Sequence, residues 1–401
     1  MENNRRLIQN ILKSQYPQLQ KKKHPVKDHK ALQALMYCQT EEQGYHFLAC
    51  PEGHESHKQL HSCRHRSCPI CADKARLDWI EKQKKHLLNC PHHHVVFTLP
   101  HEYIPLWLYN RKWMTQHFFK ACRDTLMTLL EDKRYLGATP GILMALHTWG
   151  RQLTMHPHMH CLVTSGGVDA AEKWCPLSTN FLLPIQVVKS LFRGKMQSYI
   201  KAAFFKHELK LPSDCGGVEF LKIHRSLFKK QWNIRIQEQY AHGRGVMLYL
   251  ARYIKGGPIN PKQIVQCTSE KVVFRYNDHR DQKIKQLSLA MGEFIRRILW
   301  HVPEPHVHVV RHYGLYAAQS HIKKEIGVSI LGQINEGLSN AGEEIINEVH
   351  WCCATCGALM RRVYTVYAKK RYENSYISVS WHRPVQQDVQ VGAINRLVPD
   401  G

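Results

Sequence analysis

Acidic side chains are scarce in this sequence. The 401 residues include 32 Asp and Glu against 56 Lys and Arg, so the formal net charge is +24 and the pI is near 9.5. A surplus of this size favours a polyanionic partner, although it says nothing about the fold. We expect that partner to be nucleic acid.

Long hydrophobic runs are missing as well. No apolar stretch reaches the roughly 18 residues that a membrane-spanning helix needs, although 43% of the residues are hydrophobic, as in ordinary globular proteins. The first residues, Met1–Leu7, contain no apolar signal core. The sequence therefore predicts a cytoplasmic protein of two or three domains that has no membrane partner.

The chain has 14 cysteines. Because a cytoplasmic protein of this size rarely forms disulfides, metal binding is the better explanation of their clusters. Structural zinc takes four Cys or His ligands in a tetrahedron, usually as two pairs from two tight turns. Cys68 and Cys71, separated by Pro-Ile, form one such pair. The second pair stays open, since Cys50 could combine with His54 or with Cys63.

Two more residues near this cluster, Cys38 and His57, are outside candidates that would imply a second ion. Arg64 and Arg66 lie between the ligand positions. A rigid, metal-bound loop would present both guanidinium groups to DNA phosphates.

A further pair of cysteines, Cys353 and Cys356, lies near the other end of the chain and is separated by Ala-Thr. This spacing is typical of zinc ligands, but two more ligands must come from elsewhere. The alternative is a turn with free thiols.

Three histidines alternate in the segment Met-His-Pro-His-Met-His-Cys-Leu-Val at residues 155–163. If this segment is a strand, His156, His158 and His160 project from one face. Imidazoles gathered in this way can hold a divalent cation, and Mn²⁺ tolerates them better than Mg²⁺ does. His158 and His160 are the expected ligands, and His156 is either the third or a residue that shapes the strand.

Two tyrosines, Tyr249 and Tyr253, are one helical turn apart and would share a helix face. Arg244, Arg252 and Lys255 would surround any phosphate near them with positive charge. A phenol ionises near pH 10, so its attack on a phosphodiester needs a cation or a base. The phosphotyrosine bond would preserve the energy for rejoining, in agreement with the lack of a G-x-x-x-x-G-K-[ST] nucleotide-binding loop.

The rest of the chain alternates between helical and extended patterns. Interleaved elements of this kind favour an α+β fold with a mainly antiparallel sheet flanked by helices. The expected strands are residues 94–100, 142–148, 155–164, 232–236 and 272–276, and the expected helices are 72–88, 101–136, 184–210, 246–255 and 288–299.

Five sequence blocks follow one another along the chain: Cys-Arg-x-Arg-x-Cys-Pro-x-Cys at 63–71, Val-Phe-Thr-Leu-Pro at 96–100, His-Pro-His-x-His-Cys-Leu-Val at 156–163, Tyr-Leu-x-Arg-Tyr at 249–253 and Arg-His-Tyr-Gly at 311–314. In this order they resemble the HUH endonucleases, and most closely their two-tyrosine transposases of the insertion-sequence-ninety-one type. The resemblance extends from about Cys38 to Gly314. It implies rolling-circle transposition, an HUH-like antiparallel sheet, a zinc-binding module before it, His158 and His160 as metal ligands, and Tyr249 and Tyr253 as nucleophiles.

Three domains are expected. Residues 1–90 would form an N-terminal helix and a zinc-binding, DNA-binding module, and residues 91–285 an HUH catalytic domain with its tyrosine helix at about 246–255. Residues 286–401 would form a C-terminal helical region that carries the second zinc pair.

The predicted function is metal-dependent nicking and strand transfer of single-stranded or hairpin DNA ends through 5′-phosphotyrosine. A replication initiator or a relaxase would use the same chemistry, but no helicase motif supports a fused replication protein. A metal-dependent hydrolase of small substrates would need more Asp and Glu than residues 90–280 contain. A non-catalytic zinc protein that binds DNA is the remaining alternative.

Overall fold

The computed structural model describes residues 6–21, 25–84, 87–88, 90–240, 251, 257–278, 280–318, 320, 351–367 and 379–381. The chain divides into two compact units. Unit 1 comprises Met1–Met36 and Arg64–Gly342, and unit 2 comprises Tyr37–Cys63 and Glu343–Gly401. This division differs from the expected one, because unit 2 joins a segment from the first expected domain to a segment from the last.

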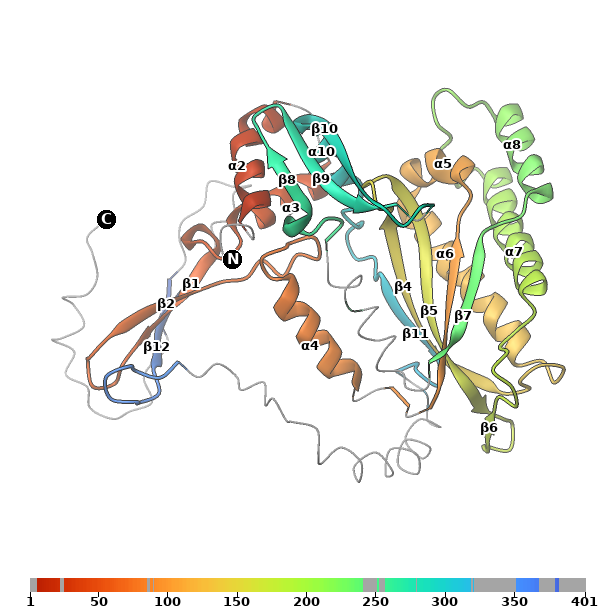
Figure 1. Ribbon diagram of the computed structural model, residues 1–401, viewed down its shortest axis with the longest axis horizontal. Coiled ribbons are helices and arrows are strands. Elements are labelled where there is room, and N and C mark those ends of the chain that lie inside the picture. Colours follow the sequence, from red (N-terminus) through yellow and green to blue (C-terminus); the bar gives the residue numbers. More distant parts are fainter. Residues whose placement is uncertain are drawn as a thin grey trace. The chain divides into compact units, whose positions relative to one another are not determined.

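An antiparallel sheet of six strands forms the centre of unit 1, as Figure 1 shows. The longest pair is a hairpin of β4 and β5, which turns where the Gly150 amide donates to the Thr154 carbonyl at 2.9 Å. The expected α+β fold with an antiparallel sheet is confirmed. The strands follow the order β11 (Val310–Gly314), β4 (Thr139–Trp149), β5 (Met155–Val168), β3 (His92–Thr98) and β7 (Ile234–Tyr240), and β6 (Trp174–Pro176) pairs with β5.

Helices cover one face of this sheet (Figure 1). The apolar residues that predict a helix over 101–136 belong to α5 (Ile104–Tyr109) and α6 (Arg111–Leu130). α7 (Ile185–Phe205) packs beside α6, and α8 (Gly217–Lys229) follows it. The main core lies between these helices and one face of the sheet, and it includes Phe118 on α6, Phe97 on β3 and Met159 on β5, which are fully buried.

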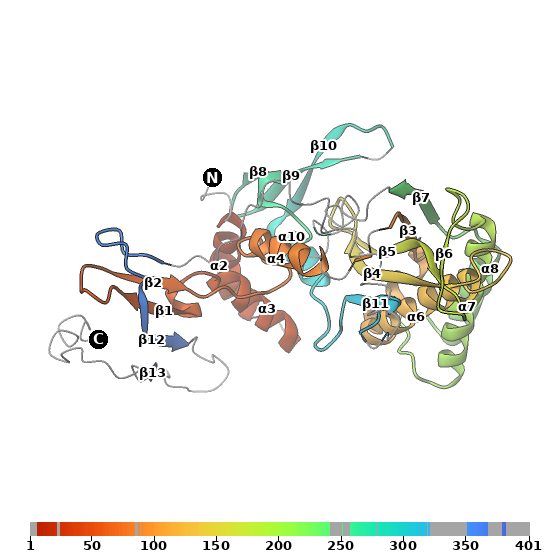
Figure 2. The same ribbon diagram turned by 90° about the horizontal axis from the view of Figure 1, so that it is seen from below.

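A small antiparallel sheet also belongs to unit 1. Its strands are β8 (Ile264–Cys267), β9 (Lys271–Asn277) and β10 (Ile284–Ala290). The helix expected over 288–299 begins only at Met291, because the residues before it pair with β9. Figure 2 shows this α10 (Met291–Trp300) near α2 (Leu7–Gln20) and α3 (Val26–Tyr37). An ion pair of 2.6 Å between Lys27 on α3 and Glu304 links α3 to the segment that follows α10.

Unit 2 has a sheet of its own, built from two distant parts of the sequence. β1 (Gly44–Ala49) pairs with β2 (Ser56–Leu60) on one side and with β12 (Arg361–Tyr367) on the other. β13 (Val379–Trp381) completes it beyond β12. The region after residue 286 was expected to be helical, but residues 361–367 are extended, since the β-branched and aromatic residues of Arg-Arg-Val-Tyr-Thr-Val-Tyr favour a strand.

Candidate functional site

Three histidines meet on one face of the sheet in unit 1. β4 and β5 pair so that His147 lies opposite His158, and Ala145 lies opposite His160. Ring centroids are 5.3 Å apart for His147 and His158, 4.4 Å for His147 and His160, and 4.9 Å for His158 and His160. One ring nitrogen from each histidine lies within 4.8 Å of the other two. The cluster is therefore close enough to share one ion.

The third histidine of this cluster is His147, whereas the sequence pattern offers His156 as a candidate. The His156 ring lies 5.2 Å from that of His158 but does not belong to the group of converging nitrogens. Its role in the structure is to offer its backbone carbonyl to His158. Hairpin geometry could have identified His147, since a short turn after Trp149 folds one expected strand onto the next and sets position 147 opposite 158.

Hydrogen bonds orient two of the three rings. Gln237 Oε1 on β7 accepts from His94 Nδ1 at 2.6 Å, which leaves His94 Nε2 to accept from His160 Nδ1 at 2.8 Å. His158 Nδ1 donates to the carbonyl of His156 at 2.7 Å. Because a neutral imidazole has one donor and one acceptor, both His158 and His160 keep a lone pair on Nε2. These are the atoms that a cation would contact.

Burial keeps the three imidazoles neutral. His147 is fully buried and His160 is 5% exposed. Loss of solvation lowers the pKa of His158 to about 4 and holds the pKa values of His147 and His160 well below their usual range, and the neighbouring imidazoles add to both effects. Neutral imidazole is the form that binds a metal, so no proton must leave before binding.

The chemistry of the donors decides which ion fits. The converging group contains imidazoles alone, and no carboxylate of the described residues belongs to it. Imidazole nitrogen suits divalent transition metals such as Mn²⁺, whereas Mg²⁺ prefers oxygen ligands. The residues present therefore fit a divalent transition metal better than they fit Mg²⁺.

Positive charge lies beside the histidines. Arg66, predicted to bind phosphate, is half-buried and donates from Nη2 to the carbonyl of Leu146 at 3.0 Å, directly before His147. Its guanidinium lies 5.4 Å from the centroid of the Trp149 ring, and burial lowers its pKa to about 10. Arg66 therefore remains charged at neutral pH next to the cluster, while Arg64 is exposed.

The tyrosine segment lies mostly outside the described residues, and this includes Tyr249, Tyr253, Arg244, Arg252 and Lys255. Ala251 is described: it is helical, fully buried, and belongs to the apolar cluster that contains Leu143, Ala145 and Leu162. These sheet residues alternate in step with the histidines, so Ala251 packs on the histidine face.

Gly257, which follows the tyrosine segment, lies close to the backbone of Ser67, the residue after Arg66. A Cβ atom added to Gly257 would lie 2.8 Å from the backbone oxygen of Ser67. Only glycine permits this approach without a shift of the backbone.

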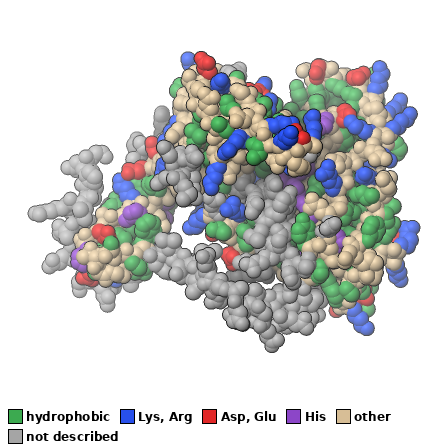
Figure 3. All heavy atoms as spheres, in the orientation of Figure 1, with side chains coloured by type: hydrophobic (Ala, Val, Ile, Leu, Met, Phe, Trp, Pro, Cys, Tyr) green, Lys and Arg blue, Asp and Glu red, His purple; other side chains and the backbone are tan. Residues whose placement is uncertain are grey.

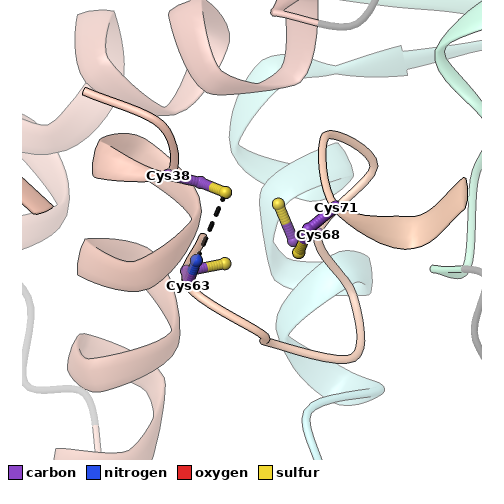
Figure 4. A group of neighbouring side chains, drawn as sticks. All are labelled: Cys38, Cys63, Cys68 and Cys71. Carbon is purple, nitrogen blue, oxygen red and sulfur yellow. Dashed lines mark hydrogen bonds between the residues drawn. The ribbon is translucent and has the colours of Figure 1, made fainter. Parts of the chain in front are cut away.

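Four cysteines converge near the N-terminal part of the chain, as Figure 4 shows. The sulfur atoms of Cys38, Cys63, Cys68 and Cys71 lie within 4.8 Å of one another, and the Cys63 amide donates to Cys38 Sγ at 3.4 Å. Four thiols at these distances fit structural zinc. Cys38, an outside candidate in the sequence, completes the group.

The other predicted ligands of this zinc, Cys50 and His54, do not join that group. They lie in unit 2 with Cys353 and Cys356, whose missing partners the sequence did not identify. His57, the remaining candidate, stacks on Trp351 at 4.1 Å between ring centroids.

Lys and Arg side chains are spread over the visible face of unit 1, and acidic side chains are few among them (Figure 3). This distribution agrees with the net charge of +24. None of the described helices is long and apolar enough to cross a membrane.

Two family models match the sequence. The model described as "Putative transposase" matches residues 141–324, which include the histidine cluster and the tyrosine segment. The model described as "Transposase zinc-binding domain" matches residues 11–99, which include the four converging cysteines.

Two similar proteins carry related names. "Putative transposase y4qJ" of Sinorhizobium fredii is 33% identical over 291 residues, which cover 71% of this chain and 73% of that protein. "Transposase for insertion sequence element IS801" of Pseudomonas savastanoi pv. phaseolicola is 29% identical over 322 residues, which cover 76% of this chain and 74% of that protein. No solved structure matches the chain.

Proposed function

Because this chain belongs to the transposase family of IS91-type insertion sequences, we propose that it nicks and rejoins single-stranded DNA ends through covalent 5′-phosphotyrosine intermediates. The observation that carries this proposal is the cluster of His147, His158 and His160, with nitrogens within 4.8 Å of one another on one hairpin. A bound Mn²⁺ or Mg²⁺ would polarise a non-bridging phosphate oxygen there.

Side chains of the protein would bind the ion and position the phosphate. His147, His158 and His160 would hold the ion, and the hydrogen-bonded chain Gln237–His94–His160 would fix the orientation of one ligand. The Arg66 guanidinium, beside the cluster, adds positive charge where the phosphate binds. These groups orient the phosphodiester and do not become covalently modified.

Tyr249 and Tyr253 are the proposed nucleophiles. One phenolate attacks the phosphorus, displaces the 3′-oxygen and keeps the 5′-phosphate as an ester, so a free 3′-hydroxyl remains. The second tyrosine attacks another strand in the same way, and each free 3′-hydroxyl can reverse the reaction on the other ester. Ala251, which lies between the two tyrosines in the sequence, packs on the histidine face, so this point of the chain lies on the side of the sheet that carries the cluster. This packing supports the proposal.

The test uses single-stranded oligonucleotides that span the two ends of the DNA element encoding this chain, together with Mn²⁺. We expect a protein-bound fragment on a denaturing gel, and we expect it to disappear in the double variant Tyr249→Phe, Tyr253→Phe. Tyr276→Phe, on β9, is the matched control and should form the adduct normally. Adduct formation by the double variant would contradict the mechanism.

A further inference from the structure

Residues 50–55 of unit 2 form a tight turn. The Cys50 amide donates to the carbonyl of Glu55 at 2.9 Å, and the Gly53 amide donates to the carbonyl of Cys50 at 3.0 Å. Gly53 has φ +77°, a conformation that favours glycine. The turn brings the side chains of Cys50 and His54 together, with 3.7 Å between Sγ and Nδ1.

Residues 353–358 form a similar turn 303 positions later in the chain (353 − 50 = 303), with the glycine one position further from the cysteine. The Cys353 amide donates to the carbonyl of Ala358 at 2.8 Å, and the Gly357 amide donates to the carbonyl of Cys353 at 2.9 Å. Gly357 has φ +71°. In both turns the amide of the first cysteine donates to the carbonyl five residues later, while the glycine amide donates back to that cysteine over three residues in one turn and over four in the other. Two tight turns, each with two zinc-type ligands, match the usual construction of a structural zinc site.

The two turns face each other. Cys50 Sγ lies 3.5 Å from Cys356 Sγ, and His54 Nδ1 lies 3.9 Å from Cys353 Sγ. Zinc bonds of about 2.3 Å to sulfur and about 2.0 Å to nitrogen place tetrahedral ligands about 3.5–3.8 Å apart. The sulfur separation is far longer than a disulfide, which is about 2.05 Å. The spacing is therefore that of zinc ligands.

Other contacts hold the same two segments together. The Ala354 amide donates to the carboxylate of Glu55, and the rings of His57 and Trp351 stack at 4.1 Å. Directly after the second turn, β12 pairs with β1 along its length. The four ligands are thus fixed by the sheet and by contacts between the turns.

We propose that Cys50, His54, Cys353 and Cys356 form a second structural zinc site, which joins the two segments of unit 2 into one folded module. The zinc-binding region of this chain is then discontinuous, because half of its second site lies beyond residues 11–99 and beyond residues 141–324, where the family models match. This inference does not rest on the proposed nicking reaction.

The test is the zinc content of the purified full-length protein, measured by elemental analysis. The variant Cys353→Ser, Cys356→Ser should hold one equivalent of zinc less than the unmodified protein. Cys352→Ser is the matched control, since Cys352 is exposed and outside the group, and it should lose none. Equal zinc in the double variant and the unmodified protein would overturn the proposal, as would an equal loss in the control.

A second variant decides the question if the double variant does not fold. His54→Cys supplies a thiolate at the same position, so the zinc content should stay unchanged. In Co²⁺-substituted protein, the added sulfur ligand should strengthen the sulfur-to-metal charge-transfer band and shift the visible absorption. An absorption spectrum identical to that of unmodified Co²⁺ protein would show that residue 54 is not a ligand.

Discussion

The histidine cluster of unit 1 and the cysteine–histidine group of unit 2 are both close enough to hold a metal ion, but they are assembled differently. The histidines come from one hairpin, in which the backbone pairing of β4 and β5 brings them together. The ligands of unit 2 come from segments 299 positions apart, such as His54 and Cys353. A site on one hairpin can exist before its metal arrives, whereas a site between distant segments needs the metal to offset the loss of chain entropy.

Metal removal should give the largest contrast between the two regions. A strong chelator should unfold the sheet of unit 2, since structural zinc contributes about 10 kcal/mol or more to small modules. Strands β3, β4 and β5 should keep their protection, because the apolar core beneath them is independent of metal. Hydrogen exchange measured with and without chelator tests this, and equal loss of protection in both sheets would refute the contrast.

The second prediction separates His147 from His156. His147→Ala should slow Mn²⁺-dependent adduct formation by about 10³-fold, since metal polarisation of a phosphoryl oxygen is worth several kcal/mol. His156→Ala removes only a side chain outside the converging group and should retain activity within about threefold. Rates of adduct formation at saturating Mn²⁺ decide between the two. If His156→Ala slowed adduct formation more than His147→Ala did, His156 would be the third ligand.

Both histidine strands and most of the central sheet could be predicted from the sequence. A short apolar run marks β4 and another marks the part of β5 after the histidines, and the alternation of histidines on β5 identifies His158 and His160. His147 requires the strand register as well, which a single strand pattern does not contain. The partners of Cys353 were beyond prediction, because no local pattern links segments so far apart, and His54 replaces the cysteine that would have completed a recognisable pair.

The third prediction concerns the residues behind the ligands. Gln237→Leu removes the acceptor that orients His94, and through His94 the ring of His160. Affinity for Mn²⁺ should fall about 10–100-fold, as for other residues that orient metal ligands, while the rate at saturating Mn²⁺ changes little. A Mn²⁺ titration of adduct formation measures both. Gln239→Leu, on the same strand, is the control, and equal effects of both variants would exclude an orienting role.

The smallest effect is expected from acid. Burial lowers the pKa of His92 to about 4 and that of His301 to about 3, against 6.5 for exposed histidine. The unfolded chain therefore binds protons first as the pH falls below 6.5, and unit 1 should lose about 1–2 kcal/mol for each group by pH 5. Denaturant unfolding at pH 7 and pH 5, followed by tryptophan fluorescence, tests this. His301→Gln should reduce the pH dependence, and an unchanged dependence would contradict the assignment.

The most direct test of the central claim is to identify the residue that becomes linked to DNA. After reaction of the full-length protein with an end-spanning oligonucleotide and Mn²⁺, protease digestion and mass spectrometry should find the nucleotide 5′-phosphate on Tyr249 or Tyr253, and His158→Ala should abolish the adduct. Linkage to any other residue, or cleavage with no linked peptide, would contradict the account.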